Sequence, residues 1–318
     1  MRGLGFRTAI IENWSNQHCD ALIALHAVRS APSIEAFRNG FPGRPLLVAL
    51  TGTDIYGDSQ SLATSLRMVE RCDAAIALTE TMRTRLPKRI RSKTHLIVQS
   101  AEPPPGRFPK SILNFEVCVV GHLRPVKDPL LVAKAVRRLP SESKIRVALY
   151  GGSMNDDLAK EVRYEGEMNP RFRWLGDRPH PETLRAIARS HLLVLPSRAE
   201  GGPAVISEAL ACGTPILATR IDASIGLLGN EYPGLFPVGD DVALAKLLRR
   251  CETDSTFFRE LKAWCRRLKP TVSPAQDRRA WGLLLATFYF YPLRVQTTGD
   301  SDIRTETYTF ARIQGRFL

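Results

Sequence analysis

The hydrophobic residues of this chain fall in short runs of strand length, separated by segments of helical length. The runs are apolar throughout, and strands of that kind are buried on both faces of a sheet. Such burial needs helices above and below, so the pattern predicts parallel sheets covered by helices. The runs are DALIALHA, PLLVALTG, DAAIALT, HLIVQS, FEVCVVG, KIRVALYG, RFRWLG, HLLVLPS and PILATR.

A proline-rich segment divides this pattern into two parts. It reads SAEPPPGRFPKS, and proline lacks the backbone N–H that helices and strands use. We therefore predict an α/β protein with an N-terminal lobe at residues 1–100, a linker at 101–114 and a C-terminal lobe at 115–270. Each lobe is expected to be a doubly wound, Rossmann-like parallel sheet, and the two lobes are expected to face a cleft.

The two ends of the chain depart from this rhythm. The opening GLGFRTAII is typical of a helix end that runs into a strand, so a first strand-helix unit is expected to be missing from the N-terminal lobe. A returning helix is predicted at 271–288. The stretch 289–318 turns polar and rich in Thr and Arg, and an irregular tail is expected there.

Composition and charge narrow the possible classes of protein. A hydrophobic content of 44% excludes a mainly disordered chain. The six cysteines show no metal-ligand spacing, so we expect a cytoplasmic protein with reduced thiols and no metal. The late apolar run WGLLLATFYFYPL is too short for stable membrane insertion. The net charge is +13, but without a basic block it predicts a local phosphate site rather than a nucleic-acid partner.

A basic loop follows the predicted strand FEVCVVG. Gly121 begins this loop, and Arg124 and Lys127 lie just before the next helix, for which Asp128 is the expected N-cap. The free N–H groups and the dipole of a helix N-terminus already favour an anion. The loop therefore predicts a phosphate site, with an ordinary exposed basic loop as the alternative.

Glycines follow two further strands of the C-terminal lobe. Gly151 and Gly152 end KIRVALYGG, and Gly201 and Gly202 stand in the stretch LPSRAEGGPAVISEA. Such glycines let the backbone approach a ligand closely, although a tight turn needs them equally. The G-x-G-x-x-G spacing of nicotinamide dinucleotide sites is absent.

Two carboxylates flank the second glycine pair. Glu200 is expected in the loop at the strand end, and Glu208 a turn or more inside the following helix. A carboxylate repels phosphate but accepts two strong hydrogen bonds from neighbouring hydroxyl groups. Together with the basic loop, the pair predicts a ligand with a diphosphate in its middle and hydroxyls at both ends, which is the layout of a nucleotide sugar.

Polar residues also end two strands of the N-terminal lobe. His26 and Arg29 follow LIAL, and Thr53 and Asp54 follow VALTG. A histidine at a strand end is often only structural. Because all four residues are expected at the same edge of a sheet, we predict that they receive the second substrate.

Several of these stretches resemble the motifs of a known family. EGGPAVISE is similar to the E-x7-E motif of retaining GT-B glycosyltransferases of the GT4 type, and VGHLRPVKD stands where those enzymes bind the donor diphosphate. His122 replaces the arginine that usually follows the loop glycine. LIALHAVRSAPS, ALTGTDIY and the two stretches just quoted look closer still to the selenosugar synthases of selenoneine biosynthesis.

The resemblance implies a function and a role for each candidate residue. Selenosugar synthases join selenophosphate to the anomeric carbon of a UDP-sugar, typically UDP-N-acetylglucosamine, without a metal or other cofactor. The implied donor-binding residues are Gly121, Arg124, Lys127, Gly151, Gly152, Glu200, Gly201, Gly202 and Glu208. The implied catalytic residues are Glu200, Arg124, Lys127 and His26, and the acceptor-binding residues are His26, Arg29, Thr53 and Asp54.

Within this reading, Glu208 holds the ribose and Glu200 faces the donor sugar, while Arg124 and Lys127 neutralise the diphosphate as charge grows on the leaving nucleotide. Two alternatives stay open. The chain could be an ordinary GT4 enzyme with a hydroxyl acceptor on a lipid or glycan, or a truncated, catalytically inactive relic.

Overall fold

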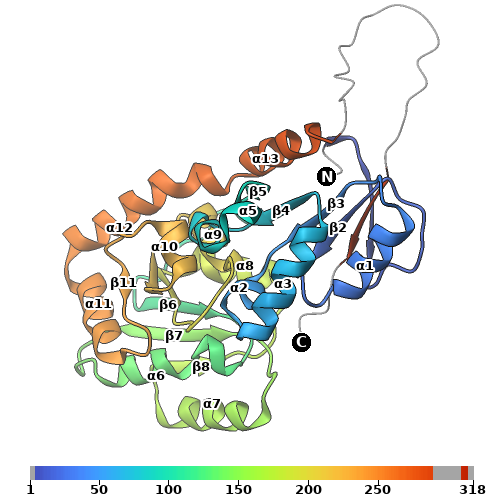
Figure 1. The fold of residues 1–318 in the computed structure, drawn as a ribbon. Helices are drawn as coiled ribbons and strands as arrows, with labels where there is room; N and C mark the ends of the chain where they lie inside the picture. Colours follow the sequence, from blue (N-terminus) through green and yellow to red (C-terminus); the bar gives the residue numbers. More distant parts are fainter. Residues whose placement is uncertain (1–3, 289–308, 314–318) are drawn as a thin grey trace, which may run out of the picture. The chain divides into compact units, whose positions relative to one another are not determined.

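The computed structural model describes residues 4–288 and the backbone of 309–313 (Figure 1). The chain divides into two compact units. Unit 1 contains the described residues before Gln99 and those after Pro274, and unit 2 contains residues 99–274. Each unit is built on a parallel sheet, as predicted from the uniformly apolar runs.

Unit 1 has a six-stranded parallel sheet in the order β1-β12-β2-β3-β4-β5. Its strands are β1 (Arg7–Ile11), β2 (Ala21–Leu25), β3 (Leu46–Ala49), β4 (Ala74–Ala77), β5 (Thr94–Leu96) and β12 (Thr309–Ile313). Its helices are α1 (Ala31–Gly40), α2 (Gly52–Tyr56), α3 (Ser59–Arg71), α4 (Glu80–Arg85), α5 (Lys88–Arg91) and α13 (Pro274–Ala286).

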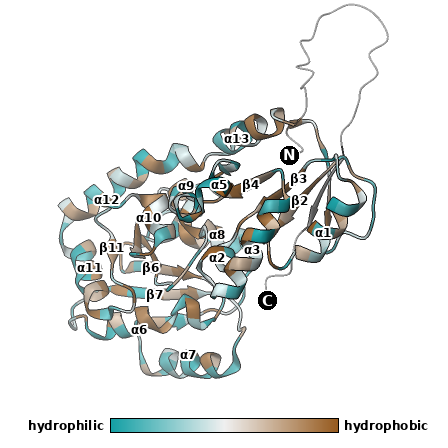
Figure 2. Cartoon of the chain, viewed as in Figure 1, coloured by the Kyte–Doolittle hydropathy of each residue, from teal (hydrophilic) through white to brown (hydrophobic). Residues whose placement is uncertain are grey.

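Both faces of the unit 1 sheet are buried. On β2, Leu22 and Ala24 belong to one core cluster, which includes residues of α1 and α3. Ala21 and Ile23 belong to a second cluster, which includes Leu284 and Leu285 of α13. Successive side chains of a strand point to opposite faces, so an all-apolar strand needs a hydrophobic cover on each side. In Figure 2, β3 and β4 are correspondingly coloured hydrophobic.

Strand β12 corrects the expectation of an irregular tail at 289–318. It pairs in parallel with β1 on one side and with β2 on the other. The polar composition of the tail suggested irregular structure, but Thr, Phe and Ile are residues that favour strands. The rest of that stretch, 289–308 and 314–318, lies outside the described residues.

Unit 2 has a six-stranded parallel sheet in the order β11-β10-β9-β6-β7-β8. Its strands are β6 (Phe115–Val120), β7 (Ile145–Tyr150), β8 (Phe172–Trp174), β9 (Leu192–Leu195), β10 (Ile216–Thr219) and β11 (Leu235–Phe236). Its α-helices are α6 (Leu130–Arg137), α7 (Asp156–Met168), α8 (His180–Arg189), α9 (Ala204–Cys212), α10 (Asp222–Leu228), α11 (Asp241–Thr253) and α12 (Ser255–Leu268). Short 3-10 helices lie at η2 (Pro125–Lys127) and η3 (Lys269–Val272).

The centre of the unit 2 sheet is formed by β9 and β6. All four residues of β9 are buried, and β6 pairs with β9 on one side and β7 on the other. The strand order reverses direction along the chain at this point, because β6 is followed by β7 on one side and by β9 on the other. In open α/β sheets, ligands bind outside the carboxyl ends of the strands at such a switch point.

Candidate active site

Three predicted loops meet at the carboxyl edge of the unit 2 sheet. They follow β6, β7 and β9, which are neighbours and all parallel. Gly121 follows β6, Gly151 follows β7 and Glu200 lies five residues beyond the end of β9. The structure thus brings the three glycine- and charge-bearing segments of the sequence to one edge of one sheet.

Lys127 and Glu200 form an ion pair in this structure. Lys127 Nζ lies 2.5 Å from Glu200 Oε1, and the Ser197 hydroxyl donates to the same oxygen over 2.7 Å. The two charged side chains are 27% and 11% exposed, so their attraction is less screened than that of a surface pair. The pair joins the predicted phosphate loop to the predicted sugar-facing carboxylate.

Arg124 differs from Lys127 in its contacts. It is half-buried, its carbonyl accepts the Lys127 N–H over 2.9 Å, and its guanidinium has no side-chain partner in the described part of the chain. One cation of the predicted phosphate loop is therefore paired with a carboxylate, and the other is available to an anion.

Arg198 is a residue of this site that sequence reasoning missed. Its guanidinium lies 2.7 Å from Asp128 Oδ2, and its backbone N–H donates to the Val126 carbonyl over 2.8 Å. Arg198 therefore ties the loop after β9 to the loop after β6. Its position three residues beyond β9 was the only available signal, and a lone exposed arginine does not stand out in a basic chain.

The predicted N-cap role of Asp128 is wrong. Asp128 adopts a left-handed backbone with φ +44°, α6 begins at Leu130, and the side chain of Asp128 pairs with Arg198 instead. An aspartate tolerates this conformation better than most residues because its short polar side chain can bond locally. This strained conformation indicates that the predicted phosphate loop is fixed by the residues around it.

Gly151 is required by close packing of the backbone. Its φ is +147°, and a Cβ there would lie 2.1 Å from the Gly121 carbonyl oxygen. Its own carbonyl accepts the Trp174 indole N–H over 2.8 Å. A Cβ on Gly152 would meet Asp177 at 3.3 Å, and the Gly152 N–H donates to His122 Nδ1 over 3.0 Å. His122 stands in the place of the usual arginine. Its hydrogen bond thus supports the loop of Gly151 and Gly152.

We expect Gly151→Ala to destabilise unit 2 and weaken UDP binding, because the added methyl group collides with the loop after β6. The strained φ alone should cost about 1–3 kcal/mol. Gly152→Ala is the matched control, since its methyl group meets only side chains. Urea unfolding and calorimetric titration with UDP measure both effects. Equal unfolding midpoints for the two variants would contradict the assignment.

Gly201 and Gly202 precede α9 and have no positive φ. The helix begins at Ala204 with Pro203 as its N-cap, and no side chain caps its first N–H groups. The backbone donors at this N-terminus therefore remain available to a ligand, as the sequence suggested.

Glu208 lies on the second turn of α9, as predicted. Its Oε1 is 2.9 Å from Nε2 of His180, the first residue of α8. Both line a hollow of about 600 Å³ in unit 2, whose wall also includes Arg185 and the Pro103–Pro105 segment. Burial raises the pKa of the nearby Cys212 thiol to about 11, and the negative charge of Glu208 adds to the rise. This thiol is therefore protonated at neutral pH.

In unit 1 the structure brings His26, Thr53 and Asp54 together at the carboxyl ends of β2 and β3. His26 Nδ1 lies 2.9 Å from Asp54 Oδ1, and His26 Nε2 lies 2.7 Å from the Thr53 hydroxyl. Arg29 is exposed on the same loop, and its backbone N–H approaches His26 Nδ1 at 3.3 Å. Three of the four predicted acceptor residues thus form one hydrogen-bonded chain.

Direct binding of the acceptor by Asp54 does not agree with the structure. Asp54 is fully buried, and its carboxylate accepts bonds from the Val28 N–H and from the N–H and hydroxyl of Thr51. The bond from the Thr51 N–H is part of the capping box of α2. Its oxygens are therefore engaged inside the protein and not exposed to a ligand.

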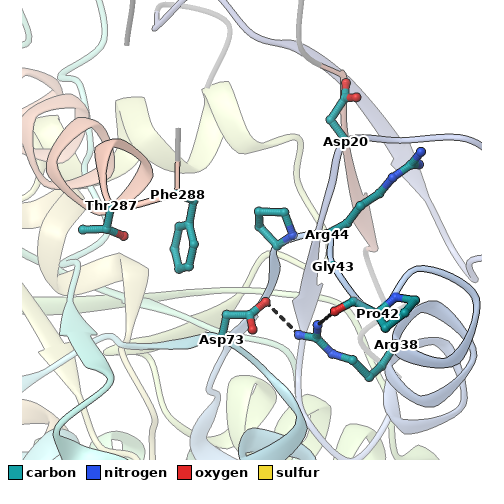
Figure 3. Close-up of a pocket in the computed structure, with 9 residues that line it drawn as sticks. Asp20, Arg38, Pro42, Gly43, Arg44, Asp73, Thr287 and Phe288 are labelled. Carbon is teal, nitrogen blue, oxygen red and sulfur yellow. Dashed lines mark hydrogen bonds and ion pairs between the residues drawn. The ribbon is translucent and has the colours of Figure 1, made fainter. Parts of the chain in front are cut away.

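A second hollow lies at the opposite edge of the unit 1 sheet, before the first residues of β2, β3 and β4. Figure 3 shows its charged lining residues. Arg38 pairs with Asp73 over 2.7 Å and donates to the Pro42 carbonyl, and Arg44 donates to the Cys19 carbonyl. The two arginines are held by partners within the protein, so this hollow is a weaker candidate than the strand ends.

Among residues 4–288 and 309–313, no group of three or more His, Cys, Asp or Glu side chains is placed to hold a metal ion. No helix there is long and apolar enough to cross a membrane.

Comparison with known proteins identifies the larger part of unit 2. Residues 111–266 match the family model described as glycosyl transferases group 1. This segment is similar to the group 1 glycosyltransferases. It contains the ion pair of Lys127 with Glu200, the glycine loops and Glu208.

Curated glycosyltransferases are similar to part of the chain. The chain is 30% identical over 143 residues to the D-inositol 3-phosphate glycosyltransferase of Mycolicibacterium paratuberculosis, and 29% identical over 145 residues to that of Mycobacterium tuberculosis. Each match covers 42% of this chain, but only 32% and 30% of the respective relative. The chain therefore matches about a third of the length of these enzymes.

Solved structures extend the likeness to most of the fold. Anabaena HepE in complex with UDP and glucose superposes with a TM-score of 0.71 at 19% identity, over 84% of this chain and 78% of HepE. Sucrose-phosphate synthase from Thermosynechococcus elongatus also gives 0.71, at 20% identity, over 84% and 73% of the chains. These likenesses confirm the predicted GT-B fold, with a parallel sheet in each of two units.

Proposed function

We propose that the protein transfers a sugar from a UDP-sugar to selenophosphate. The observation on which the proposal mainly rests is the pairing of Lys127 with Glu200, in a segment that also contains Glu208 and matches the group 1 glycosyltransferase model. HepE, which shares the fold, has been solved with UDP and with UDP-glucose. Selenophosphate as acceptor rests on the resemblance of LIALHAVRSAPS and ALTGTDIY to selenosugar synthases.

In this proposal the donor diphosphate takes Lys127 away from Glu200 and also binds Arg124. Glu200 is then released to accept hydrogen bonds from hydroxyls of the sugar, and Glu208 accepts those of the ribose. When the bond from the anomeric carbon to the diphosphate breaks, its electron pair stays on UDP. Cations already placed at that position stabilise this charge without having to move.

The acceptor selenium forms the new bond to the anomeric carbon. Attack of water on phosphorus then breaks the phosphorus–selenium bond and releases inorganic phosphate. The products are a selenosugar, UDP and phosphate. Arg29, exposed beside His26, supplies a positive charge for the phosphate part of selenophosphate.

The test is to incubate the full chain with UDP-N-acetylglucosamine and selenophosphate, and to measure UDP and phosphate together with selenium-77 resonances of the product. Equal release of UDP and phosphate with a carbon-bound selenium signal supports the proposal. UDP release with a sugar or lipid hydroxyl acceptor, and none with selenophosphate, would instead indicate an ordinary group 1 transferase. Binding of UDP without turnover of any acceptor would indicate a catalytically inactive protein.

A further inference from the structure

We propose that Thr53, His26 and Asp54 form a proton relay that removes a proton from the acceptor during sugar transfer. The inference rests on the proposed function and deepens its acceptor side. It assigns the acceptor a chemical property, namely a hydrogen on the attacking atom, whether that atom is selenium or oxygen.

The position of the hydrogen on His26 follows from its neighbours. Nδ1 lies 2.9 Å from the Asp54 carboxylate, and a bare nitrogen at that distance would set two lone pairs against each other. Nδ1 therefore bears the hydrogen and donates it to Asp54, since this contact is shorter than the 3.3 Å contact from the Arg29 N–H. In the neutral ring, Nε2 then presents a lone pair to the Thr53 hydroxyl, 2.7 Å away.

Asp54 is built to hold His26 in this state. It is fully buried, and bonds from the Val28 and Thr51 N–H groups fix its carboxylate. A fixed carboxylate orients the ring and stabilises the positive charge that forms when Nε2 gains a proton. Asp54 is thus a positioning residue that acts through His26.

The backbone around His26 indicates that the ring position is imposed rather than relaxed. His26 has φ +72°, in the left-handed region that non-glycine residues rarely adopt. The Ser30 hydroxyl donates to the Leu25 carbonyl over 2.7 Å, and the Ser30 N–H donates to that of His26 over 3.0 Å, which closes the loop around the ring. Strained residues of this kind collect at functional sites.

The exposure of the three side chains indicates the direction of proton transfer in the relay. Thr53 is exposed, His26 is 9% exposed and Asp54 is fully buried. A proton from outside therefore reaches Nε2 through the Thr53 oxygen, which accepts one proton while giving its own to the ring. A hydroxyl group, a histidine and a carboxylate have the same order in enzymes in which the histidine removes the proton of that hydroxyl group.

The proposed step balances as follows. The attacking atom forms a bond to the anomeric carbon, the bond from that carbon to the diphosphate oxygen breaks, and its electron pair leaves with UDP. The hydrogen of the attacking atom passes to the Thr53 oxygen, and the Thr53 hydrogen passes to His26 Nε2. The imidazolium returns its proton to solvent after the products leave.

Two substitutions of Thr53 separate a relay from a structural contact. Thr53→Val keeps the shape but lacks the hydroxyl, and Thr53→Ser keeps the hydroxyl. With the acceptor that the protein uses, we expect kcat to fall about 10²- to 10⁴-fold in Thr53→Val and in His26→Gln. This is the range for loss of a general base. Thr53→Ser should recover most of the activity. Thr84→Val, an exposed threonine of α4, is the control.

Calorimetric titration with UDP shows whether the donor side stays intact. We expect wild-type UDP affinity in every variant of the relay. Wild-type kcat in both Thr53→Val and His26→Gln, in a protein that makes product, would overturn the relay and leave the proposed function standing.

A spectroscopic test does not depend on turnover. In nitrogen-15 histidine spectra of the full chain, the relay requires a neutral His26 with the hydrogen on Nδ1, and loss of that preference in Asp54→Asn. A hydrogen on Nε2 in the wild type would overturn the relay even if no acceptor were turned over. Failure of the proposed function alone would appear as an absence of product with the tautomer as expected.

Discussion

Lys127→Ala should lower kcat for sugar transfer by about 10²- to 10³-fold, the usual effect of removing one group that stabilises charge in a transition state. Lys127 lies in the loop that follows β6, and its Nζ is 2.5 Å from Glu200 Oε1. Its loss removes positive charge from the diphosphate and leaves a partly buried carboxylate without its partner. The loss of positive charge beside the diphosphate raises the energy of the leaving nucleotide in the transition state.

Lys134→Ala is the matched control, because Lys134 is exposed on α6, a few residues further along the chain. Steady-state kinetics with UDP-N-acetylglucosamine measures the effect, and urea unfolding shows whether the variant stays folded. If Lys127→Ala retained kcat within about twofold in a folded protein, the role of Lys127 would be wrong. Arg124→Ala in the same assay measures how much the second cation of the loop contributes to kcat.

Glu208→Ala should weaken UDP binding by about 10- to 150-fold, which corresponds to the ~1.5–3 kcal/mol of a hydrogen bond to a charged group. The carboxylate is 15% exposed on the second turn of α9 and is held by His180 in this structure. We expect the effect mainly in KM for the donor, because the ribose does not change during the reaction.

Glu182→Ala is the control for this second experiment, since Glu182 is an exposed carboxylate in the first turn of α8, two residues after His180. Calorimetric titration with UDP and with uracil separates the ribose from the base. Unchanged UDP affinity in Glu208→Ala would show that the carboxylate does not bind the ribose.

The strands were predictable because a strand that is buried on both faces of a sheet consists of consecutive apolar residues. β3, β4 and β9 are uninterrupted apolar runs, and their short length between helical segments favours buried strands. β12 was missed for the opposite reason. Its five residues include the polar Thr309 and Arg312, and its place between β1 and β2 depends on pairing with strands from the other end of the chain.

The residue types of the site were predictable, but their pairings were not. Glycines and charges after strands are local signals, and parallel strands bring such loops to one edge. The contact of Lys127 with Glu200 depends on β6 and β9 being neighbours, which is a property of the strand order. The salt bridge of Arg198 with Asp128, the left-handed backbone of His26 and the burial of Asp54 likewise result from tertiary packing.

The ion pair between Lys127 and Glu200 bears on how the site would choose among small molecules. In the empty site these two charges cancel, so a free phosphate ion would have to separate them and leave the carboxylate facing a second negative charge. A complete UDP-sugar gives each of them a new partner at once, phosphate oxygens for the lysine and sugar hydroxyls for the glutamate. The proposed site would thereby favour the intact donor over its fragments, and the used nucleotide would depart as the pair closes again.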